Sequence, residues 1–210
     1  MQINTSTKTQ QVEYQLTAMW YREHVRSWAA IVNHFKPKTY LEVGSFEGGS
    51  LTWFTEALAN YNDKFTIYCV DTWEGGEDHD KGIMQAVESR FDFNLEVLRR
   101  RYAADIYKIK AQSYLALSQL LVNQNFVEHF DLIFIDGSHQ SPDVILDCCL
   151  AYKLLKRGGV LILDDYIWRH ELGILHEPKL AIDSFVNIYR DKLAFIPDLP
   201  LRQVSLVKVY

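Results

Sequence analysis

Long apolar runs are absent from this chain of 210 residues, and no stretch approaches the about 18 consecutive apolar residues of a membrane-spanning helix. The first ten residues also lack the basic start and continuous apolar stretch of a signal peptide. These two absences argue against a membrane partner and against routine export.

Cysteine is scarce, and its positions do not indicate a bonded framework. Cys69, Cys148 and Cys149 fall within stretches that we expect to be strand or helix, without the spacing of a metal knuckle. We interpret them as small buried residues in a reducing compartment. The expected location is therefore cytoplasmic.

An excess of positive charge is missing as well. The formal net charge is −5, and acidic and basic residues are interspersed, so no extended basic surface could neutralise a phosphate backbone. The one basic cluster, residues 99–101, ends an expected helix, where cations interact favourably with the helix dipole. Nucleic acid is therefore not expected as a partner.

Short apolar and β-branched runs alternate with helical segments along most of the chain. The expected strands are residues 39–43, 65–70, 106–109, 132–135 and 160–163, and the expected helices are 50–59, 82–101, 113–122, 141–155 and 178–189. Two last strands, 193–196 and 203–209, are too close for a crossover helix and must be antiparallel. The pattern predicts an α/β, doubly wound, Rossmann-like sheet of seven mostly parallel strands with an antiparallel C-terminal strand.

The ends of several elements carry their own signals. Residues 12–35 have helical apolar spacing and predict one or two helices that cover the sheet, with a homodimer face as a further candidate role.

Ser141 is the expected N-cap of a helix with Pro142 in its first position, and Gly158 and Gly159 should end that helix. We expect a flexible tail over residues 1–12 and one domain over 13–210.

Carboxylates follow the expected strands at their carboxyl ends, where open α/β sheets bind ligands. These residues are Glu42, Asp71, Asp136, Asp164 and Asp165. Two like charges about 4 Å apart repel by about 4 kcal/mol at an effective dielectric near 20, so such a group requires cations or hydrogen-bond donors. The alternative is that Asp136 caps a turn while Asp164 and Asp165 bond to local backbone.

A glycine-rich turn, residues 44–50, follows the first expected strand. Its glycines let a ligand approach the backbone, and the next helix directs N–H groups at that ligand. A tight turn that needs glycine for its dihedral angles is the alternative. Phe46 stands where a dinucleotide-binding turn has its middle glycine, and Glu42 precedes the turn. Both features suit a cationic ligand better than a diphosphate.

Residues after the second and third strands are placed to hold a nucleoside. Asp71 could accept hydrogen bonds from both ribose hydroxyls, and Gln112 and Ser113 could reach an adenine. Trp73 either stacks on a base and covers the site or is a surface aromatic in a loop.

Four segments, residues 41–50, 70–73, 130–139 and 154–166, together resemble class I S-adenosylmethionine-dependent methyltransferases. The chain is most similar to small O-methyltransferases that include catechol O-methyltransferase, macrocin-type sugar O-methyltransferases and cephalosporin-hydroxylase-like proteins. The resemblance implies methyl transfer from S-adenosylmethionine to a hydroxyl of a small-molecule acceptor, such as a sugar, a phenol or a secondary metabolite.

The resemblance also implies roles for individual residues. Glu42, Gly44 and Ser50 would hold the methionine part and Asp71 the ribose. The whole expected cofactor set is Glu42, Gly44, Ser45, Phe46, Gly48, Ser50, Asp71, Thr72, Trp73, Gln112, Ser113 and Asp136. A divalent ion, usually Mg²⁺, would lie on Asp136, Asp164 and Asp165, whose hard oxygens suit that ion.

Asp136 and His139 are the expected catalytic residues. His139 follows the fourth strand, where an imidazole could take the proton of an acceptor hydroxyl, although a capping or packing role is an alternative. The loops that carry His79, His170 and His176 should form the acceptor pocket. Two other functions stay open: a nucleotide-dependent oxidoreductase or hydroxylase-like protein on the same sheet, and a non-catalytic cofactor-binding subunit.

Overall fold

The computed structural model describes residues 13–76 and 81–210. The tail expected over residues 1–12 and the expected pocket residue His79 lie outside the described residues. The strands are β1 (Thr39–Val43), β2 (Phe65–Asp71), β3 (Ala104–Lys110), β4 (Phe130–Ile135), β5 (Leu155–Leu163), β6 (Leu193–Phe195) and β7 (Val204–Lys208). The helices are α1 (Val25–Phe35), α2 (Gly49–Ala59), α3 (Lys81–Met84), α4 (Val87–Arg101), α5 (Ser113–Val122), α6 (Ser141–Leu154) and α7 (Pro178–Ile188), with 3-10 turns at Trp20–Glu23, Gln124–Phe126 and Ile174–His176.

Within the described residues, seven strands form one sheet in the order β3-β2-β1-β4-β5-β7-β6. The first five strands are parallel to one another, and β7 runs antiparallel to both β5 and β6. This confirms the predicted doubly wound sheet and its antiparallel C-terminal end. Strand order reverses between β1 and β4, so a ligand site is expected beyond the carboxyl ends of these two strands.

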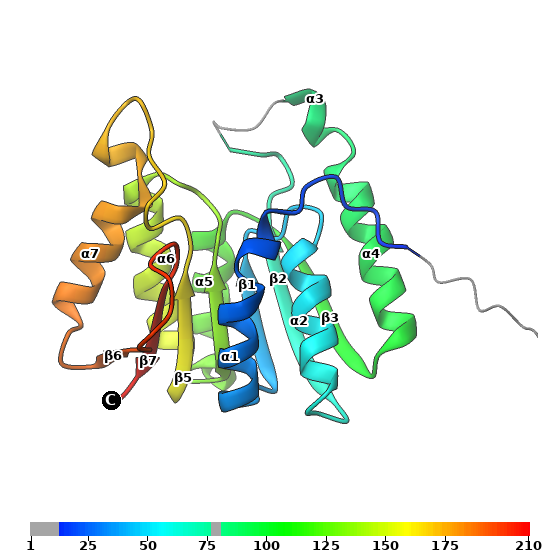
Figure 1. The fold of residues 1–210 in the computed structure, drawn as a ribbon, viewed down its shortest axis with the longest axis horizontal. Helices are drawn as coiled ribbons and strands as arrows, with labels where there is room; N and C mark the ends of the chain where they lie inside the picture. The colour runs from blue at the N-terminus through cyan, green and yellow to red at the C-terminus, as the bar shows by residue number, and fades with distance from the viewer. Residues whose placement is uncertain (1–12, 77–80) are drawn as a thin grey trace, which may run out of the picture.

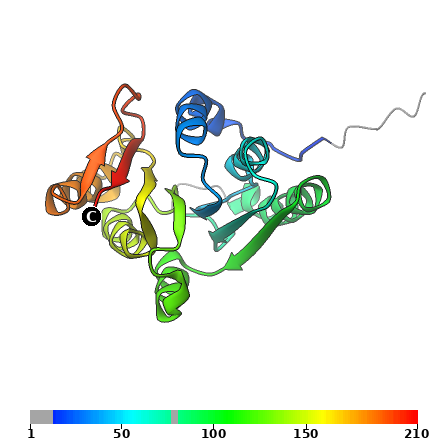
Figure 2. The ribbon, with the colours of Figure 1, turned by 90° about the horizontal axis from the view of Figure 1, so that it is seen from below.

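Helices cover both faces of the sheet (Figures 1 and 2). Helices α1, α2 and α4 pack on one face around Trp28, Phe54 and Phe91. Helices α5, α6 and α7 pack on the other face, where Phe185 and Leu117 are fully buried. Two separate cores, one on each face, thus hold the strands of the sheet in place. None of the described helices is long and apolar enough to cross a membrane.

The segment before the sheet is less helical than its apolar spacing predicts. Residues 13–19 form no helix, and regular helix begins only at Val25. Side chains from elsewhere bind the backbone groups that a helix would use: the Gln15 N–H donates to Asn94, and the Thr17 N–H donates to Glu47. Residues 13–19 therefore cross the glycine-rich turn in a non-helical conformation, and we call this segment the strap. The homodimer face stays a prediction.

Three boundaries also differ from the sequence-based prediction. The N-cap of α6 is Gln140, and the Ser141 hydroxyl donates instead to the Glu177 carbonyl at 2.6 Å, so a tertiary contact replaces the cap. Strand β5 already begins at Leu155 and contains both glycines; the glycines lie in a register shift against β4. The long helix expected over residues 82–101 is interrupted between α3 and α4.

Candidate functional site

The turn after β1 is packed directly against the carboxyl end of β4. Gly44 has φ +85°, and a Cβ built on it would lie 1.8 Å from the Asp136 carbonyl oxygen. Its N–H donates to the Val70 carbonyl of β2 at 2.9 Å. Only glycine fits here, and its close packing brings the turn and the Asp136 loop together at the topological switch point.

Asp71 at the end of β2 fastens this turn. Its Oδ2 accepts the N–H groups of Ser45 and Phe46, both at 2.8 Å, and its Oδ1 accepts the Trp73 N–H at 2.7 Å. A carboxylate has about four acceptor positions, so these three bonds occupy most of the acceptor capacity of Asp71. Asp71 therefore holds the backbone of the two turns that follow β1 and β2, a structural role that the sequence analysis did not predict.

Glu42 is fully buried beneath the turn. It accepts hydrogen bonds from the Tyr40 hydroxyl at 3.2 Å, the Ser45 hydroxyl at 2.9 Å and the Ser50 hydroxyl. Burial raises the pKa of Glu42 to about 7, and the hydroxyl donors limit that rise. The carboxyl group thus ties Ser45 and Ser50 at the two ends of the turn to β1.

Two non-glycine residues near the turn have left-handed backbone, Phe46 with φ 48° and Trp73 with φ 55°. The Trp73 indole N–H donates to the Phe46 carbonyl at 2.9 Å, and the two strained turns are therefore bonded to each other. Trp73 is 4% exposed and packs on Phe91 with ring centroids 4.7 Å apart. The ring is therefore part of the core, which contradicts the surface-aromatic interpretation of Trp73 and also argues against its stacking on a base.

The remaining residues expected around the cofactor lie along the same edge. Gly48, with φ +83°, is the N-cap of α2, and the Thr72 hydroxyl accepts the Glu74 N–H in the turn after β2. Gln112 is the exposed N-cap of α5, and Ser113 begins that helix. These groups border the same end of neighbouring parallel strands.

Asp147 on α6 is a buried acid next to this region that sequence reasoning missed. It is 1% exposed, its side chain bonds to that of Ser113, and its Oδ1 has no hydrogen-bond partner among the residues that the structure describes. Burial raises the pKa of Asp147 to about 7. The apolar spacing of the helix gave no signal for an acid on its buried face.

The raised pKa of Asp147 predicts a pH-dependent stability. Burial favours the protonated form of Asp147 in the folded state. The free energy of unfolding is therefore highest below about pH 4, where this acid is protonated in both states, and it falls as the pH rises to 7. We expect Asp147→Asn to increase the free energy of unfolding above pH 7 by up to about 4 kcal/mol, and to change it little near pH 4. Urea unfolding at several pH values measures this, with Asp63→Asn at an exposed turn as the control. Parallel pH curves for Asp147→Asn and the native protein would refute the prediction.

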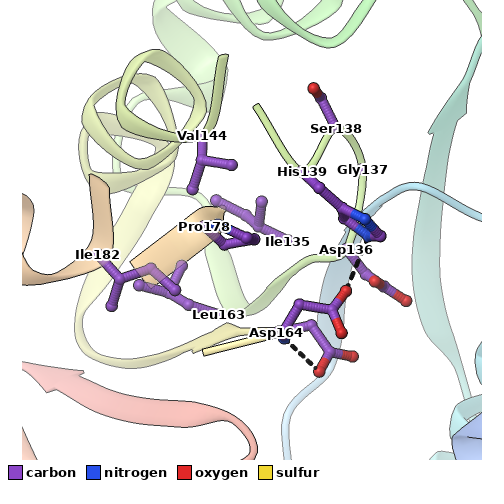
Figure 3. Close-up of a pocket in the computed structure, with 11 residues that line it drawn as sticks. Ile135, Asp136, Gly137, Ser138, His139, Val144, Leu163, Asp164, Pro178 and Ile182 are labelled. Atoms are coloured by element: carbon purple, nitrogen blue, oxygen red, sulfur yellow. Dashed lines mark hydrogen bonds and ion pairs between the residues drawn. The ribbon is translucent and has the colours of Figure 1, made fainter. Parts of the chain in front are cut away.

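Acidic groups and a histidine meet beyond β4 and β5. One ligand atom each from Asp136, His139 and Asp165 lies within 4.8 Å of the others. His139 Nε2 is 2.8 Å from Asp165 Oδ2. Figure 3 shows His139, Asp136 and Asp164 at the polar end of a pocket whose other wall is made by Val144 and Ile182.

Burial and neighbouring carboxylates raise the pKa values of Asp136 and Asp164. Burial raises the pKa of Asp136 well above its usual range, and Asp164, Asp165 and other nearby carboxylates raise it further. Burial and the neighbouring Asp165 raise the pKa of Asp164 to about 7. A divalent cation bound among these carboxylates would offset their mutual repulsion.

Asp164 lines the same pocket as Asp136, His139 and Asp165 and has hydrogen-bond partners of its own. Its Oδ1 accepts the Asp165 N–H at 2.7 Å and its Oδ2 accepts the Gln203 side-chain N–H at 2.9 Å. Among the described residues, the group that could share an ion is Asp136, His139 and Asp165. The predicted ligand set of Asp136, Asp164 and Asp165 stays a prediction; Asp164 also bonds to Gln203, the residue before β7.

The loop after β5 places aromatic rings next to the cluster. The ring centroids of His139 and Trp168 are 4.5 Å apart, and His170 follows 5.5 Å beyond Trp168. His176 stacks on His170 at 5.5 Å. His170 and His176 therefore lie in the loop beside the pocket, where the acceptor pocket was predicted.

Several supporting residues carried no recognisable sequence signal. The Glu47 side chain is buried in the glycine-rich turn, where it accepts from Thr17 and pairs with Arg90. Asn94 donates to the Glu47 carbonyl at 2.8 Å. His24 lies 3.8 Å from Asp164. All these contacts join segments far apart in the sequence, so local patterns could not predict them.

Comparison with known proteins gives a consistent family. The family model described as "Methyltransferase domain" matches residues 41–166. A curated protein of Acanthamoeba polyphaga mimivirus, named Uncharacterized protein R132, is 33% identical over 132 residues, which are 61% of this chain and 51% of that protein. This chain thus spans about half the length of its curated relative.

Solved methyltransferase structures share the fold. The calicheamicin methyltransferase CalS11 matches with a TM-score of 0.64 at 16% identity, over 89% of this chain and 79% of that one. The O-methyltransferase of Bacillus cereus, solved in complex with SAH, matches with a TM-score of 0.60 at 17% identity, over 93% of this chain and 83% of that one. With the family model covering more than half of its length, the chain belongs to the methyltransferase-domain family and has the Rossmann-like class I methyltransferase fold.

Proposed function

We propose that this chain transfers a methyl group from S-adenosylmethionine to a hydroxyl group of a small molecule, with help from a divalent ion. The observation that carries the proposal is the contact of Gly44 with Asp136, since it joins the glycine-rich turn to the cluster of Asp136, His139 and Asp165. A cofactor on the turn would then lie beside groups able to receive an acceptor. The family membership argues against the oxidoreductase alternative.

The cofactor proposal rests on the chemistry of the sheet edge. The α2 N-terminus suits the carboxylate of the methionine part, and Asp71 would accept from a ribose hydroxyl. The carboxylates of Glu42, Asp71 and Asp136 create a negative environment for the sulfonium and ammonium charges. The Bacillus cereus neighbour was solved with SAH, which supports the same cofactor class for this fold.

The residues of the cluster fit a divalent ion. Asp136, Asp164 and Asp165 would offer hard oxygen atoms to the ion, while His139, in the same 4.8 Å group as Asp136 and Asp165, would receive the proton. The raised pKa of Asp136 reflects buried carboxylates crowded together, as expected where a cation belongs. Bound Mg²⁺ would polarise the acceptor hydroxyl and favour its ionised form.

The chain's own residues would align the reactants and receive one proton. S-adenosylmethionine held by the glycine-rich turn and Asp71 would supply an activated methyl group, whose in-line transfer to the acceptor oxygen would leave the electron pair of the carbon–sulfur bond on sulfur. The hydroxyl proton passes to the pair formed by His139 and Asp165, in which the carboxylate orients the imidazole. The loop with Trp168 and His170 would border the acceptor and exclude water.

A methyl-transfer assay tests this function. The purified chain is incubated with S-adenosylmethionine and a panel of sugar and phenol acceptors, and release of S-adenosylhomocysteine is measured. We expect acceptor-dependent release that excess chelator suppresses and added Mg²⁺ restores. Unchanged activity in chelator would remove the ion from the proposal but leave the cofactor; no release with any hydroxyl acceptor, despite cofactor binding, would favour a non-catalytic subunit.

A further inference from the structure

Asp147 on α6 is a buried acid that the proposed reaction leaves without a role. It lies one helical turn after Val144, which lines the pocket of the acidic cluster (Figure 3), and it is 1% exposed. Its side chain bonds to that of Ser113, and its Oδ1 has no hydrogen-bond partner among the described residues. Within that part of the chain, Asp147 therefore acts on its surroundings through Ser113.

Ser113 lies at the edge of the sheet where we propose that the cofactor binds. It is the first residue of α5, two residues after Ala111, whose N–H donates to the Asp71 carbonyl at 3.0 Å. Asp71 is the proposed acceptor for a ribose hydroxyl, so the base joined to that ribose would lie near the start of α5. Ser113 is half-buried and thus partly accessible to a ligand at this edge.

The bond to Asp147 limits what the Ser113 hydroxyl can offer to such a ligand. A hydroxyl has one proton and two lone pairs, whereas an ionised carboxylate can only accept. Ser113 must therefore donate its one proton to an ionised Asp147, and it can offer a ligand only lone pairs. Burial raises the pKa of Asp147 to about 7, so the carboxylate is its main form at pH 8.

An oxygen that only accepts can distinguish two purines that differ at position 6. The 6-amino group of adenine donates hydrogen bonds, whereas the 6-oxo group of hypoxanthine accepts them. Such an oxygen would bond to the amino group and would face the oxo group with lone pairs on both sides. A mismatch of this kind weakens binding by about 10-fold or more.

We infer that Asp147 is a positioning residue, which holds the proton of the Ser113 hydroxyl so that the Ser113 oxygen accepts from the 6-amino group of the cofactor. Asp147 thereby sets the selectivity for the base without touching the cofactor. This inference rests on the proposed function, because the cofactor must occupy this edge of the sheet.

Two probes that differ only in the base test the inference. They are S-adenosylhomocysteine and S-inosylhomocysteine, in which a 6-oxo group replaces the 6-amino group, and calorimetry at pH 8 gives the ratio of their affinities. We expect the native protein to prefer S-adenosylhomocysteine by about 10-fold or more. Asp147→Leu frees the Ser113 proton to turn toward the ligand, and Ser113→Ala removes the hydroxyl. Each variant should reduce the preference by about fivefold or more.

The double variant shows whether Asp147 acts through Ser113. When Ser113→Ala is already present, adding Asp147→Leu should change the preference by less than about twofold, a non-additive result. Ser118→Ala, at an exposed position of α5, and Asp63→Leu, at an exposed turn, are the matched controls and should keep the native preference. Thermal unfolding checks that each variant is folded, and a ratio of two affinities for one variant does not depend on the fraction of folded protein.

Four results would overturn the inference. Native protein that binds both probes equally would show that the 6-amino group is not recognised. A native preference kept by Asp147→Leu or by Ser113→Ala would remove that residue from the recognition, and an effect of Asp147→Leu that persists without the Ser113 hydroxyl would show another route. These three outcomes leave the proposed function intact. Folded native protein that binds neither probe would contradict the proposed function, and the inference with it.

Discussion

Gly44→Ala should destabilise the protein by at least about 3 kcal/mol and abolish cofactor binding. Its φ of +85° is unfavourable for alanine, and the added Cβ would lie 1.8 Å from the Asp136 carbonyl oxygen. The backbone of β4 cannot retreat without disturbing its pairing with β1. Urea unfolding measures the loss of stability, and calorimetry with S-adenosylhomocysteine measures the loss of binding.

Gly158→Ala is the matched control for this prediction. Gly158 has a similar φ of +79°, but no described atom lies within 4 Å of its added Cβ. It should therefore lose only the conformational strain, about 1 to 2 kcal/mol. Equal losses for the two variants would show that the close approach to Asp136 has no energetic importance.

His139→Ala should lower kcat for methyl transfer by about 10² to 10⁴-fold and leave the affinity for S-adenosylhomocysteine within about threefold of the native value. The imidazole contacts Asp165 and Trp168 beside the pocket, whereas the turn that would hold the cofactor is fastened by other residues. Kinetics with the best acceptor of the panel, together with calorimetry, separate the two effects.

His34→Ala controls for loss of an imidazole at an exposed position near the end of α1. It should keep the native kcat. If His139→Ala retains more than a tenth of the native kcat, His139 is not the proton acceptor, and its contacts with Asp165 and Trp168 are structural.

The sheet could be predicted because four of its parallel strands, β1, β2, β4 and β5, contain a short apolar run that ends at a glycine or an acid. Val43 before Gly44 and Ile135 before Asp136 are examples, and the structure confirms both ends. The close spacing of the last two strands also correctly required an antiparallel pair. Local sequence patterns were therefore sufficient to predict these features.

Tertiary contacts decided what the sequence could not predict. Helical apolar spacing suggested helix before Val25, but Asn94 and Glu47 bind the backbone of the strap. The hydrogen bond between Gln203 and Asp164 depends on the register that places these two residues opposite each other. Neither effect has a signal in nearby residues.

Calorimetric titration of S-adenosylhomocysteine into the folded native chain tests the central claim most directly. The account predicts saturable binding at one site per chain, because the turn and the carboxylates of Glu42, Asp71 and Asp136 would together bind one cofactor. A folded chain that shows no detectable binding would contradict the proposed methyltransferase activity.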